Sequence, residues 1–224
     1  MDKDLEELWP GGPVYRQTAG VFPLGTDSLL LADFVKTAGV RRAADLGCGA
    51  GALMLFLCGR SPALSCDGVE LDPAAAALCR ENLAANDFSA RAGVVTGDLR
   101  DCRTFWAAGA YDLVVSNPPY FPKQSSASPD PARNKARSEG DCPLPALCAA
   151  AAYLCRAGGR FAVVHRPERL AELFCAMAAA GLEPKRLQSV CPRPDAAPSL
   201  ILVEGRRGGR PGLVFEPPLV LRKE

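Results

Sequence analysis

The 224-residue sequence contains a single histidine, His165, and none of its ten cysteines forms a C-x-x-C pair. Zinc sites and disulfide-rich modules show regular cysteine or histidine spacings, and such spacings are missing here. We therefore predict no metal site. We interpret the cysteines as reduced residues that pack as small hydrophobes in a reducing compartment.

The sequence also lacks the apolar segments that direct a chain into or across a membrane. Its first ten residues, MDKDLEELWP, are acidic and contain no apolar core of a signal peptide. No apolar run approaches the roughly 20 residues that span a bilayer. We expect a cytoplasmic protein without a membrane partner.

An excess of charge of either sign is missing as well, since 26 basic and 25 acidic residues give a formal net charge of +1. A dedicated non-specific DNA-binding protein is usually far more basic. An enzyme that binds RNA briefly needs only a local basic patch, and the net charge does not exclude one. The length suits one substantial α/β domain, and we expect a monomer or a weak dimer.

Between residues 40 and 181, apolar strand-like segments alternate with helix-like segments. Such alternation is typical of β-α-β units and a mostly parallel sheet. The last two strand-like segments are joined by PRPDAAP, which is too short for a crossover and predicts an antiparallel terminal hairpin. The sequence therefore predicts an α/β, Rossmann-like fold with a seven-stranded sheet. Its expected strands are 40–47, 64–71, 91–98, 111–117, 161–166, 183–192 and 198–207, and its expected helices are 51–60, 72–87, 143–159 and 167–181.

Additional elements are expected at both ends of this core. Residues 13–25 read as a short β-ribbon, and Thr26 is a good N-cap for a helix that Gly39 can end. The tail has Gly and Pro punctuation and could add a peripheral ribbon. We divide the chain into an N-terminal ribbon and helix, a cofactor-binding domain and a C-terminal extension, which pack as one compact domain. The boundaries are 1–39, 40–206 and 207–224.

The first strand of the core ends in a glycine-rich loop directly before a helix. Three glycines let the backbone turn sharply and approach a ligand without Cβ clashes. The acid at the strand end, Asp45, suits an ammonium group and repels a pyrophosphate, which distinguishes the loop from phosphate-binding fingerprints. The candidate binding residues of this loop are Asp45, Leu46, Gly47, Cys48, Gly49 and Gly51.

Two further acids end the next two strands. Glu70, followed by Leu71, lies about twenty residues beyond the glycines, where a carboxylate can bind both hydroxyls of a ribose. Asp98, followed by Leu99, ends the third strand within reach of an adenine amino group. Because parallel strands end at one edge of the sheet, the three acids predict a site for an adenosine-type cofactor. Any one of them could instead cap a helix or be solvated.

These motifs resemble those of class I S-adenosylmethionine methyltransferases. The resemblance implies the class I fold, S-adenosyl-L-methionine as cofactor and S-adenosyl-L-homocysteine as product. It also implies that the Asp45 loop runs alongside the methionine moiety of the cofactor, that Glu70 binds the ribose, and that Asp98 and Leu99 flank the adenine.

The fourth strand delivers Asn117-Pro118-Pro119-Tyr120 to the same edge, and Asn117 also borders the cofactor site. The exocyclic nitrogen of adenine is a poor nucleophile, because its lone pair is delocalised into the ring. The side-chain oxygen of Asn117 and the rigidly held carbonyl of Pro118 can accept its two hydrogens, and Tyr120 can stack on the base. Positioning against a sulfonium methyl can then accelerate transfer without a strong base. A merely rigid loop is the alternative interpretation.

The N-terminal segment narrows the choice of substrate amine. Tyr15-Arg16-Gln17 and the following FPLGTDSLLL resemble the bacterial tRNA1(Val) (adenine(37)-N6)-methyltransferase family, as do 136–139, 164–170 and 216–219. The resemblance implies methylation of an adenine N6 in tRNA, with Thr26 and Asp27 near the reactive end of the cofactor. Ser138 stands where that family often has His.

Three alternatives stay open. Protein glutamine-N5 methyltransferases share the Asn-Pro-Pro-Tyr motif. They have a two-domain architecture with a separate helical domain before the cofactor loop, whereas only 44 residues precede Asp45 here. Ribosomal RNA guanine-N2 methyltransferases more often carry Phe in place of Tyr120. A cofactor-binding sensor or assembly factor is a non-enzyme alternative, which the intact motif disfavours.

An RNA substrate needs cations near the base that is modified. The candidates lie in a polar loop at 121–142, where they can contact phosphates or simply be solvated. They are Lys123, Arg133, Lys135 and Arg137. His165 ends a strand, and for it we expect a supporting or capping role rather than catalysis.

Overall fold

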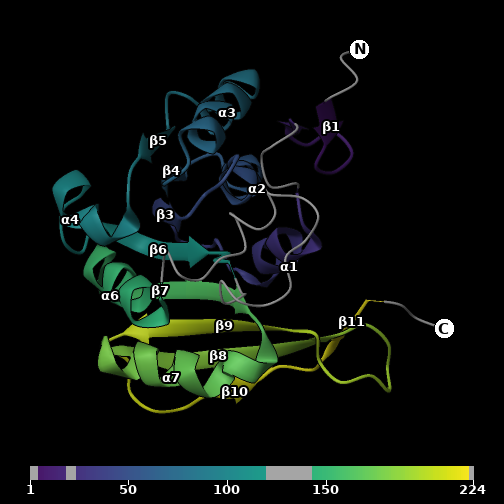
Figure 1. The fold of residues 1–224 in the computed structure, drawn as a ribbon, viewed down its shortest axis with the longest axis vertical. Helices are drawn as coiled ribbons and strands as arrows, with labels where there is room; N and C mark the ends of the chain where they lie inside the picture. The colour runs from purple at the N-terminus through teal and green to yellow at the C-terminus, as the bar shows by residue number, and fades with distance from the viewer. Residues whose placement is uncertain (1–4, 19–23, 120–142, 222–224) are drawn as a thin grey trace.

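A computed structural model of the chain describes residues 5–18, 24–119 and 143–221 (Figure 1). An antiparallel N-terminal ribbon precedes a mixed sheet flanked by helices on both faces. The strands are β1 Leu5–Glu7, β2 Val14–Arg16, β3 Arg42–Leu46, β4 Ser65–Glu70, β5 Ala92–Thr96, β6 Tyr111–Ser116, β7 Cys155–His165, β8 Leu182–Cys191, β9 Leu200–Arg207, β10 Val214–Phe215 and β11 Leu219–Val220. The helices are α1 Thr26–Phe34, α2 Ala52–Arg60, α3 Pro73–Ala85, α4 Cys102–Phe105, α6 Leu144–Leu154 and α7 Leu170–Ala179, with short 3-10 turns η1 Leu99–Asp101 and η3 Pro167–Arg169.

Across the described residues, the main sheet has nine strands in the order β10-β8-β9-β7-β6-β3-β4-β5, and β11 also pairs with β8. Strands β3 to β7 run parallel, whereas β9 is antiparallel to both of its neighbours, β7 and β8. The predicted parallel sheet and terminal hairpin are therefore confirmed. The tail adds β10 and β11 in parallel beside β8, so the sheet is wider than the seven strands expected.

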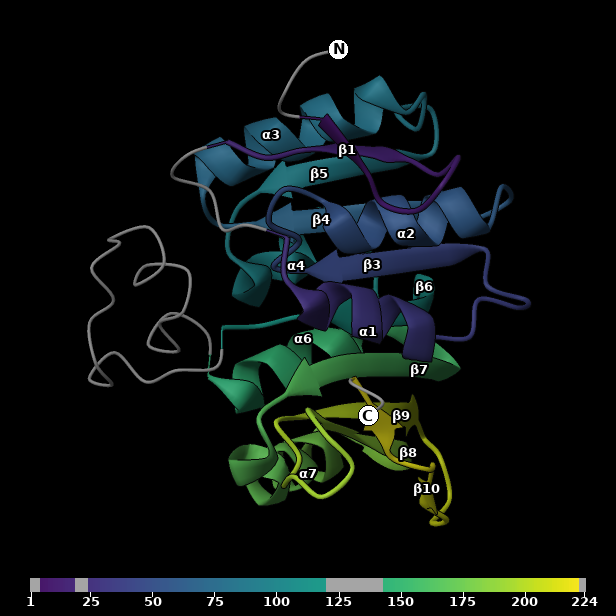
Figure 2. The ribbon, with the colours of Figure 1, turned by 90° about the vertical axis from the view of Figure 1, so that its right-hand side faces the viewer.

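Two hydrophobic cores lie on opposite faces of this sheet. Helices α1, α2 and α3 cover one face, and Figure 2 shows α1 and α2 in front of the strands. Helices α6 and α7 pack on each other and cover the other face. Helix α2 is almost entirely buried because its sequence, ALMLFLCGR, is apolar around most of its circumference. Eight of the nine cysteines in the described ranges are buried, as expected for small hydrophobes.

The N-terminal ribbon is attached to α3 by two asparagines whose side chains pair with strand β2. Asn82 accepts the N–H of Arg16 at 2.9 Å and donates to its carbonyl at 3.2 Å. Asn86 pairs in the same way with Val14, at 2.7 Å in each direction. Asn82 also donates to the carbonyl of Ala50 at 3.0 Å, which links the ribbon to the glycine-rich loop.

Three expected boundaries differ in the structure. The ribbon is built from β1 and β2, and so lies earlier than the predicted 13–25. Gly25, in an extended conformation, precedes α1 as its N-cap, and no side chain caps this end, so the predicted capping role of Thr26 is wrong. The helix expected to reach residue 159 ends at Leu154, because Cys155 already pairs with Tyr111 and begins β7.

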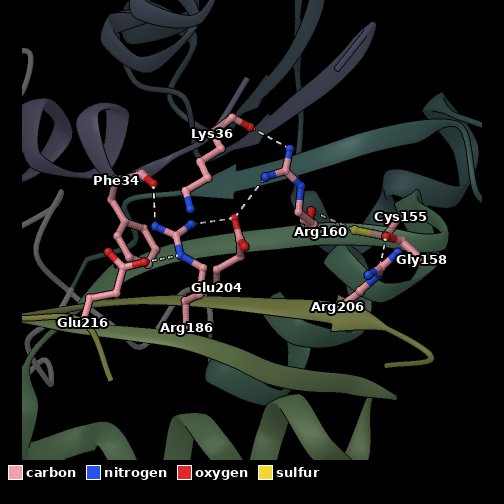
Figure 3. Close-up of polar contacts among 9 residues, drawn as sticks. All are labelled: Phe34, Lys36, Cys155, Gly158, Arg160, Arg186, Glu204, Arg206 and Glu216. Carbon is pink, nitrogen blue, oxygen red and sulfur yellow. Dashed lines mark hydrogen bonds and ion pairs between the residues drawn. The ribbon is translucent and has the colours of Figure 1, made fainter. Parts of the chain in front are cut away.

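Helix α1 is much shorter than the segment predicted to end at Gly39, and arginines from other elements bind carbonyls at its C-terminal end. Arg60 donates to Ala32 at 3.0 Å, Arg186 to Phe34 at 3.1 Å and Arg160 to Lys36 at 2.6 Å. Figure 3 shows the last two contacts. Arg60 and Arg186 satisfy carbonyls that the helix terminus leaves without intrahelical partners, whereas Lys36 lies just beyond the helix; all three cations complement the partial negative charge of this end.

The tail belongs to the same network. The Arg186 guanidinium stacks over the Phe34 ring at 4.1 Å and bonds Glu216 of the tail at 2.6 Å. Both Arg186 and Arg160 lie 3.3 Å from the buried carboxylate of Glu204 on β9 (Figure 3). The tail is therefore joined through Arg186 to the end of α1.

Candidate functional site

The register of four parallel strands brings the predicted site residues to one edge of the sheet. Asp45 pairs with Val115, so two residues further along each strand Gly47 comes level with Asn117. On the other side of β3, Leu46 pairs with Val69, and Glu70 in turn pairs with Thr96. Asn117, the glycine-rich loop, Glu70 and the Asp98 turn therefore follow one another in that order along the carboxyl ends of the strands, where ligands bind in open α/β sheets.

The glycine-rich loop adopts a conformation that requires glycine. Gly49 has φ +55° and Gly51 has φ +88°, a left-handed region that residues with a Cβ rarely enter. A Cβ on Gly51 would also lie 2.6 Å from the Cys79 sulfur of α3, so the loop packs directly on that helix. Beside Gly49 the space is open. The loop thus presents bare backbone on its outer side.

Glu70 holds this loop and the next one at the same time. One carboxylate oxygen accepts the N–H of Gly49 at 2.8 Å, and the other accepts the N–H of Asp72 at 2.8 Å. Asp72 caps α3 by accepting from Ala74. Glu70 is half-buried. Its carboxylate is therefore fixed in orientation before any ligand arrives.

Asp45 is a buried carboxyl group, with 1% of its surface exposed. Neither of its side-chain oxygens has a hydrogen-bond partner within the described part of the chain. Burial, together with the negative charge of Glu70, raises the pKa of Asp45 to about 8. A buried carboxyl group without a partner is costly, and a cation placed beside it would remove that cost.

Asp98 has a different environment. It caps η1 by accepting the N–H of Arg100, and the Arg100 guanidinium binds both of its oxygens. Hydrogen bonding to Arg100 holds the pKa of Asp98 below its ordinary value. The capping role therefore applies to Asp98, and it shapes the turn that carries the half-buried Leu99. Leu71, at the neighbouring strand end, is 52% exposed.

Asn117 leaves β6 between two anchors. The hydroxyl of Ser116 is buried and donates to the carbonyl of Leu46 at 2.7 Å, which fixes the end of β6 against β3. The Asn117 side-chain amide donates to the hydroxyl of Ser28 on α1 at 2.9 Å. Pro118 is buried and Pro119 is half-buried. The structure thus brings α1 into contact with Asn117.

For the remaining predicted residues, the structure gives a position or no description. Thr26 is exposed and Asp27 half-buried in the first turn of α1. His165 is fully buried at the end of β7, where Ile201 is its strand partner. Tyr120 and the candidate cations Lys123, Arg133, Lys135 and Arg137 lie outside the described residues, as does Ser138.

Sequence reasoning missed Ser28, Ser116 and Asn82, which support the site from three different elements. A weak signal was present, because Ser116 directly precedes the motif and Ser28 follows Thr26 and Asp27. Within the described ranges, no group of three or more His, Cys, Asp or Glu side chains could hold a metal ion. No helix that the structure describes is both long and apolar enough to cross a bilayer.

Solved structures share this fold. A "predicted O-methyltransferase" from Agrobacterium tumefaciens superposes with a TM-score of 0.72 at 24% identity, covering 87% of each chain. The geranyl diphosphate C-methyltransferase of Streptomyces coelicolor A3(2), solved with S-adenosyl-L-homocysteine, gives 0.62 at 16% identity, over 81% of this chain and 80% of the other. At these identities the likeness concerns the fold.

Sequence comparisons identify the family. Residues 16–172 match the methyltransferase small domain family. The tRNA1(Val) (adenine(37)-N6)-methyltransferase of Porphyromonas gingivalis is 37% identical over 85% of this chain and 76% of its own length. The enzyme of that name from Tolumonas auensis is 35% identical over 89% and 82%. The chain therefore belongs to the methyltransferase small domain family and, within it, to the tRNA1(Val) (adenine(37)-N6)-methyltransferases.

Proposed function

We propose that this chain transfers a methyl group from S-adenosyl-L-methionine to the exocyclic N6 of an adenine in tRNA, at a position like adenine 37 of tRNA1(Val). The observation that carries the proposal is the meeting of Asp45, Glu70 and Asn117 at one edge of the sheet. Asp45 suits the ammonium group and Glu70 suits the ribose of an adenosyl amino acid. Asn117 suits the amine that accepts the methyl group.

The residues present fit the cofactor. The buried Asp45 carboxyl group has no partner in the described chain and suits the α-ammonium group, while the outer side of the glycine loop gives its methionine part room to lie. The fixed carboxylate of Glu70 has lone pairs left for two ribose hydroxyls. Leu71 and Leu99 offer apolar surface to an adenine ring. When bound, the cofactor supplies a methyl group on a sulfonium centre.

The chain's own contribution to the transfer is positional. The Asn117 oxygen and the Pro118 carbonyl accept the two hydrogens of the substrate amine, so the nitrogen lone pair becomes available to the methyl group. Pro118 and Pro119 hold that carbonyl rigidly, since each fixes φ and lacks an N–H. Tyr120 would stack on a flipped-out base, and the cations at 123–137 would contact RNA phosphates.

Adenine in tRNA is favoured over guanine N2 and over a glutamine amide by the relatives. The relatives from Porphyromonas gingivalis and Tolumonas auensis both carry the tRNA1(Val) adenine name, and the match spans most of both chains. The N-terminal ribbon clamped by Asn82 and Asn86 also differs from a separate helical domain. A cofactor-binding sensor without turnover is disfavoured because the amide of Asn117 is held in place for chemistry.

The test is methyl transfer from radiolabelled cofactor to total bacterial tRNA, followed by nucleoside mass spectrometry. We expect N6-methyladenosine with the wild type and at least a hundredfold less with Asn117→Ala, by roughly the factor that loss of a positioned polar group costs. Binding of S-adenosyl-L-homocysteine to the variant should be retained. If tRNA stays unlabelled while ribosomal RNA or a release factor accepts the methyl group, the substrate proposal is wrong and the cofactor proposal survives.

A further inference from the structure

The side chain of Asn117 is held by a residue that lies 89 positions earlier in the chain. Its amide nitrogen donates to the hydroxyl of Ser28 at 2.9 Å, in a half-buried contact. Ser28 is the third residue of α1, whereas Asn117 follows β6. The contact therefore joins the N-terminal motif to the motif that faces the substrate.

The orientation of an asparagine amide decides what it presents. One branch of the planar group is an acceptor oxygen and the other is an NH2 with two donors. A substrate amine offers hydrogens, so it is matched by the oxygen and opposed by the NH2. Because the NH2 of Asn117 is directed to Ser28, the oxygen lies on the other branch of the amide.

Both partners of this hydrogen bond lie on anchored elements. The end of β6 is fixed by the bond from Ser116 to the carbonyl of Leu46 at 2.7 Å. The other end of α1 is fixed by arginines: Arg186 binds the carbonyl of its last residue, Phe34, and Arg160 binds the carbonyl of Lys36 just beyond the helix (Figure 3). Arg60 adds a third contact, to Ala32 at 3.0 Å. The hydroxyl of Ser28 is therefore a stationary acceptor rather than the tip of a free loop.

We propose that Ser28 is a positioning residue, which sets the amide of Asn117 with its oxygen toward the amine that receives the methyl group. The inference rests on the proposed function and assigns a role to a residue in α1. Ser28 acts through Asn117, so its loss should slow the chemical step and leave cofactor affinity and the KM for tRNA close to wild type.

The experiment compares Ser28→Ala with Ser28→Thr, which keeps the hydroxyl, in steady-state methylation of tRNA. We expect kcat to fall roughly tenfold in Ser28→Ala, since one lost hydrogen bond is worth about that factor, and to stay within about threefold in Ser28→Thr. The matched control is Ser65→Ala at the opposite end of the sheet, which loses a hydroxyl that donates to the Arg41 carbonyl at 3.2 Å. The control should show wild-type kinetics.

The same substitution in an Asn117→Asp variant shows whether Ser28 sets the orientation of the Asn117 amide or only supports the local structure. The carboxylate in Asn117→Asp has two equivalent oxygens, so it has no orientation to set. Adding Ser28→Ala to that background should cost less than about twofold, whereas independent effects would multiply. In ¹⁵N spectra of the free protein, the side-chain amide signal of Asn117, identified by its loss in Asn117→Ala, should shift and exchange faster in Ser28→Ala than in Ser65→Ala.

The outcomes are distinguishable. An active wild type with an equally active Ser28→Ala, or an amide signal unchanged by that substitution, overturns the role of Ser28 alone. Equal losses from Ser28→Ala in both backgrounds, with a lowered melting temperature, make Ser28 a merely structural residue and also overturn it. A wild type that methylates no RNA overturns the proposed function and this inference with it.

Discussion

The carboxylate of Glu70 accepts the backbone N–H of Gly49 at 2.8 Å. The residue proposed to bind the ribose therefore also supports the glycine-rich loop. The other oxygen of Glu70 holds the N–H of Asp72 at the start of α3. One side chain thus joins the ends of β3 and β4 to the following helix. Substitutions of Glu70 should therefore disturb both the ligand contact and the shape of the loop.

The first prediction concerns this double role. We expect Glu70→Ala to weaken binding of S-adenosyl-L-homocysteine at least a hundredfold, because it removes hydrogen bonds to a charged group worth about 1.5–3 kcal/mol each. Glu70→Gln keeps one acceptor oxygen and should lose less. Isothermal titration calorimetry measures both. The exposed Glu81, which pairs with Arg16 at 3.7 Å, provides the control Glu81→Gln, and equal affinities of Glu70→Ala and this control would contradict the assignment.

The second prediction is a pH dependence of stability from Asp45. Its pKa rises from 3.8 to about 8 in the folded protein, so between these values the folded state binds a proton that the unfolded state has lost. The free energy of unfolding should therefore fall as the pH rises through this range, by at most about 1.4 kcal/mol per pH unit. Urea unfolding of the ligand-free protein from pH 5 to pH 8 measures the slope.

Two comparisons test the origin of that slope. Asp45→Asn has nearly the same shape and does not titrate, so its profile should be flatter than that of the wild type. Asp33→Asn, which removes an exposed carboxylate on α1 paired with Arg60, should keep the wild-type slope. Saturating S-adenosyl-L-homocysteine should flatten the wild-type profile too, because its ammonium group favours the ionised carboxylate. A wild-type slope in Asp45→Asn would assign the effect to another group.

The third prediction concerns the network of Arg186. Its guanidinium bonds Glu216, lies 3.3 Å from the buried Glu204 and stacks on Phe34. Arg186→Met should lower the free energy of unfolding by about 3 kcal/mol, because it leaves buried charge less well paired. The exposed pair of Arg156 and Asp112 serves as control, and Arg156→Met should cost no more than about 1 kcal/mol. Similar costs for the two substitutions in urea unfolding would show that the network adds little.

The fourth prediction concerns the clamp on the N-terminal ribbon. Asn82 makes hydrogen bonds to the N–H and carbonyl of Arg16 and to the carbonyl of Ala50. Asn82→Ala removes all three and leaves these backbone groups without their partner, so we expect a loss of about 2–3 kcal/mol in the free energy of unfolding. Hydrogen exchange should show faster exchange of the Arg16 amide. Unchanged exchange there would mean that Asn82 does not hold the ribbon.

The fifth prediction concerns RNA binding by the segment after Asn117-Pro118-Pro119-Tyr120. Replacing Lys123, Arg133, Lys135 and Arg137 together by Gln should weaken tRNA binding and reduce its dependence on salt, since each phosphate contact releases counterions. A filter-binding titration at several salt concentrations measures the slope. Affinity for S-adenosyl-L-homocysteine should be retained. An unchanged salt slope would assign the RNA contact to other cations.

The sequence by itself determined that the cofactor half is built of parallel strands and which polar residues stand at their ends. Each acid or amide directly follows a run of apolar residues, and in a parallel sheet such positions share one edge, so local pattern was sufficient to group Asp45, Glu70 and Asn117. The antiparallel terminal hairpin was equally predictable, because PRPDAAP is too short for a crossover.

Tertiary contacts decided the features that depend on partners far apart in the chain. Helix α6 ends early because Cys155 pairs with Tyr111. The carbonyls at the end of α1 find their partners in arginines from other elements. The bond between Ser28 and Asn117 likewise joins residues that no local pattern connects. Propensity and periodicity act over a few residues, whereas the partner of a buried polar group is chosen only when the packed chain brings donor and acceptor together.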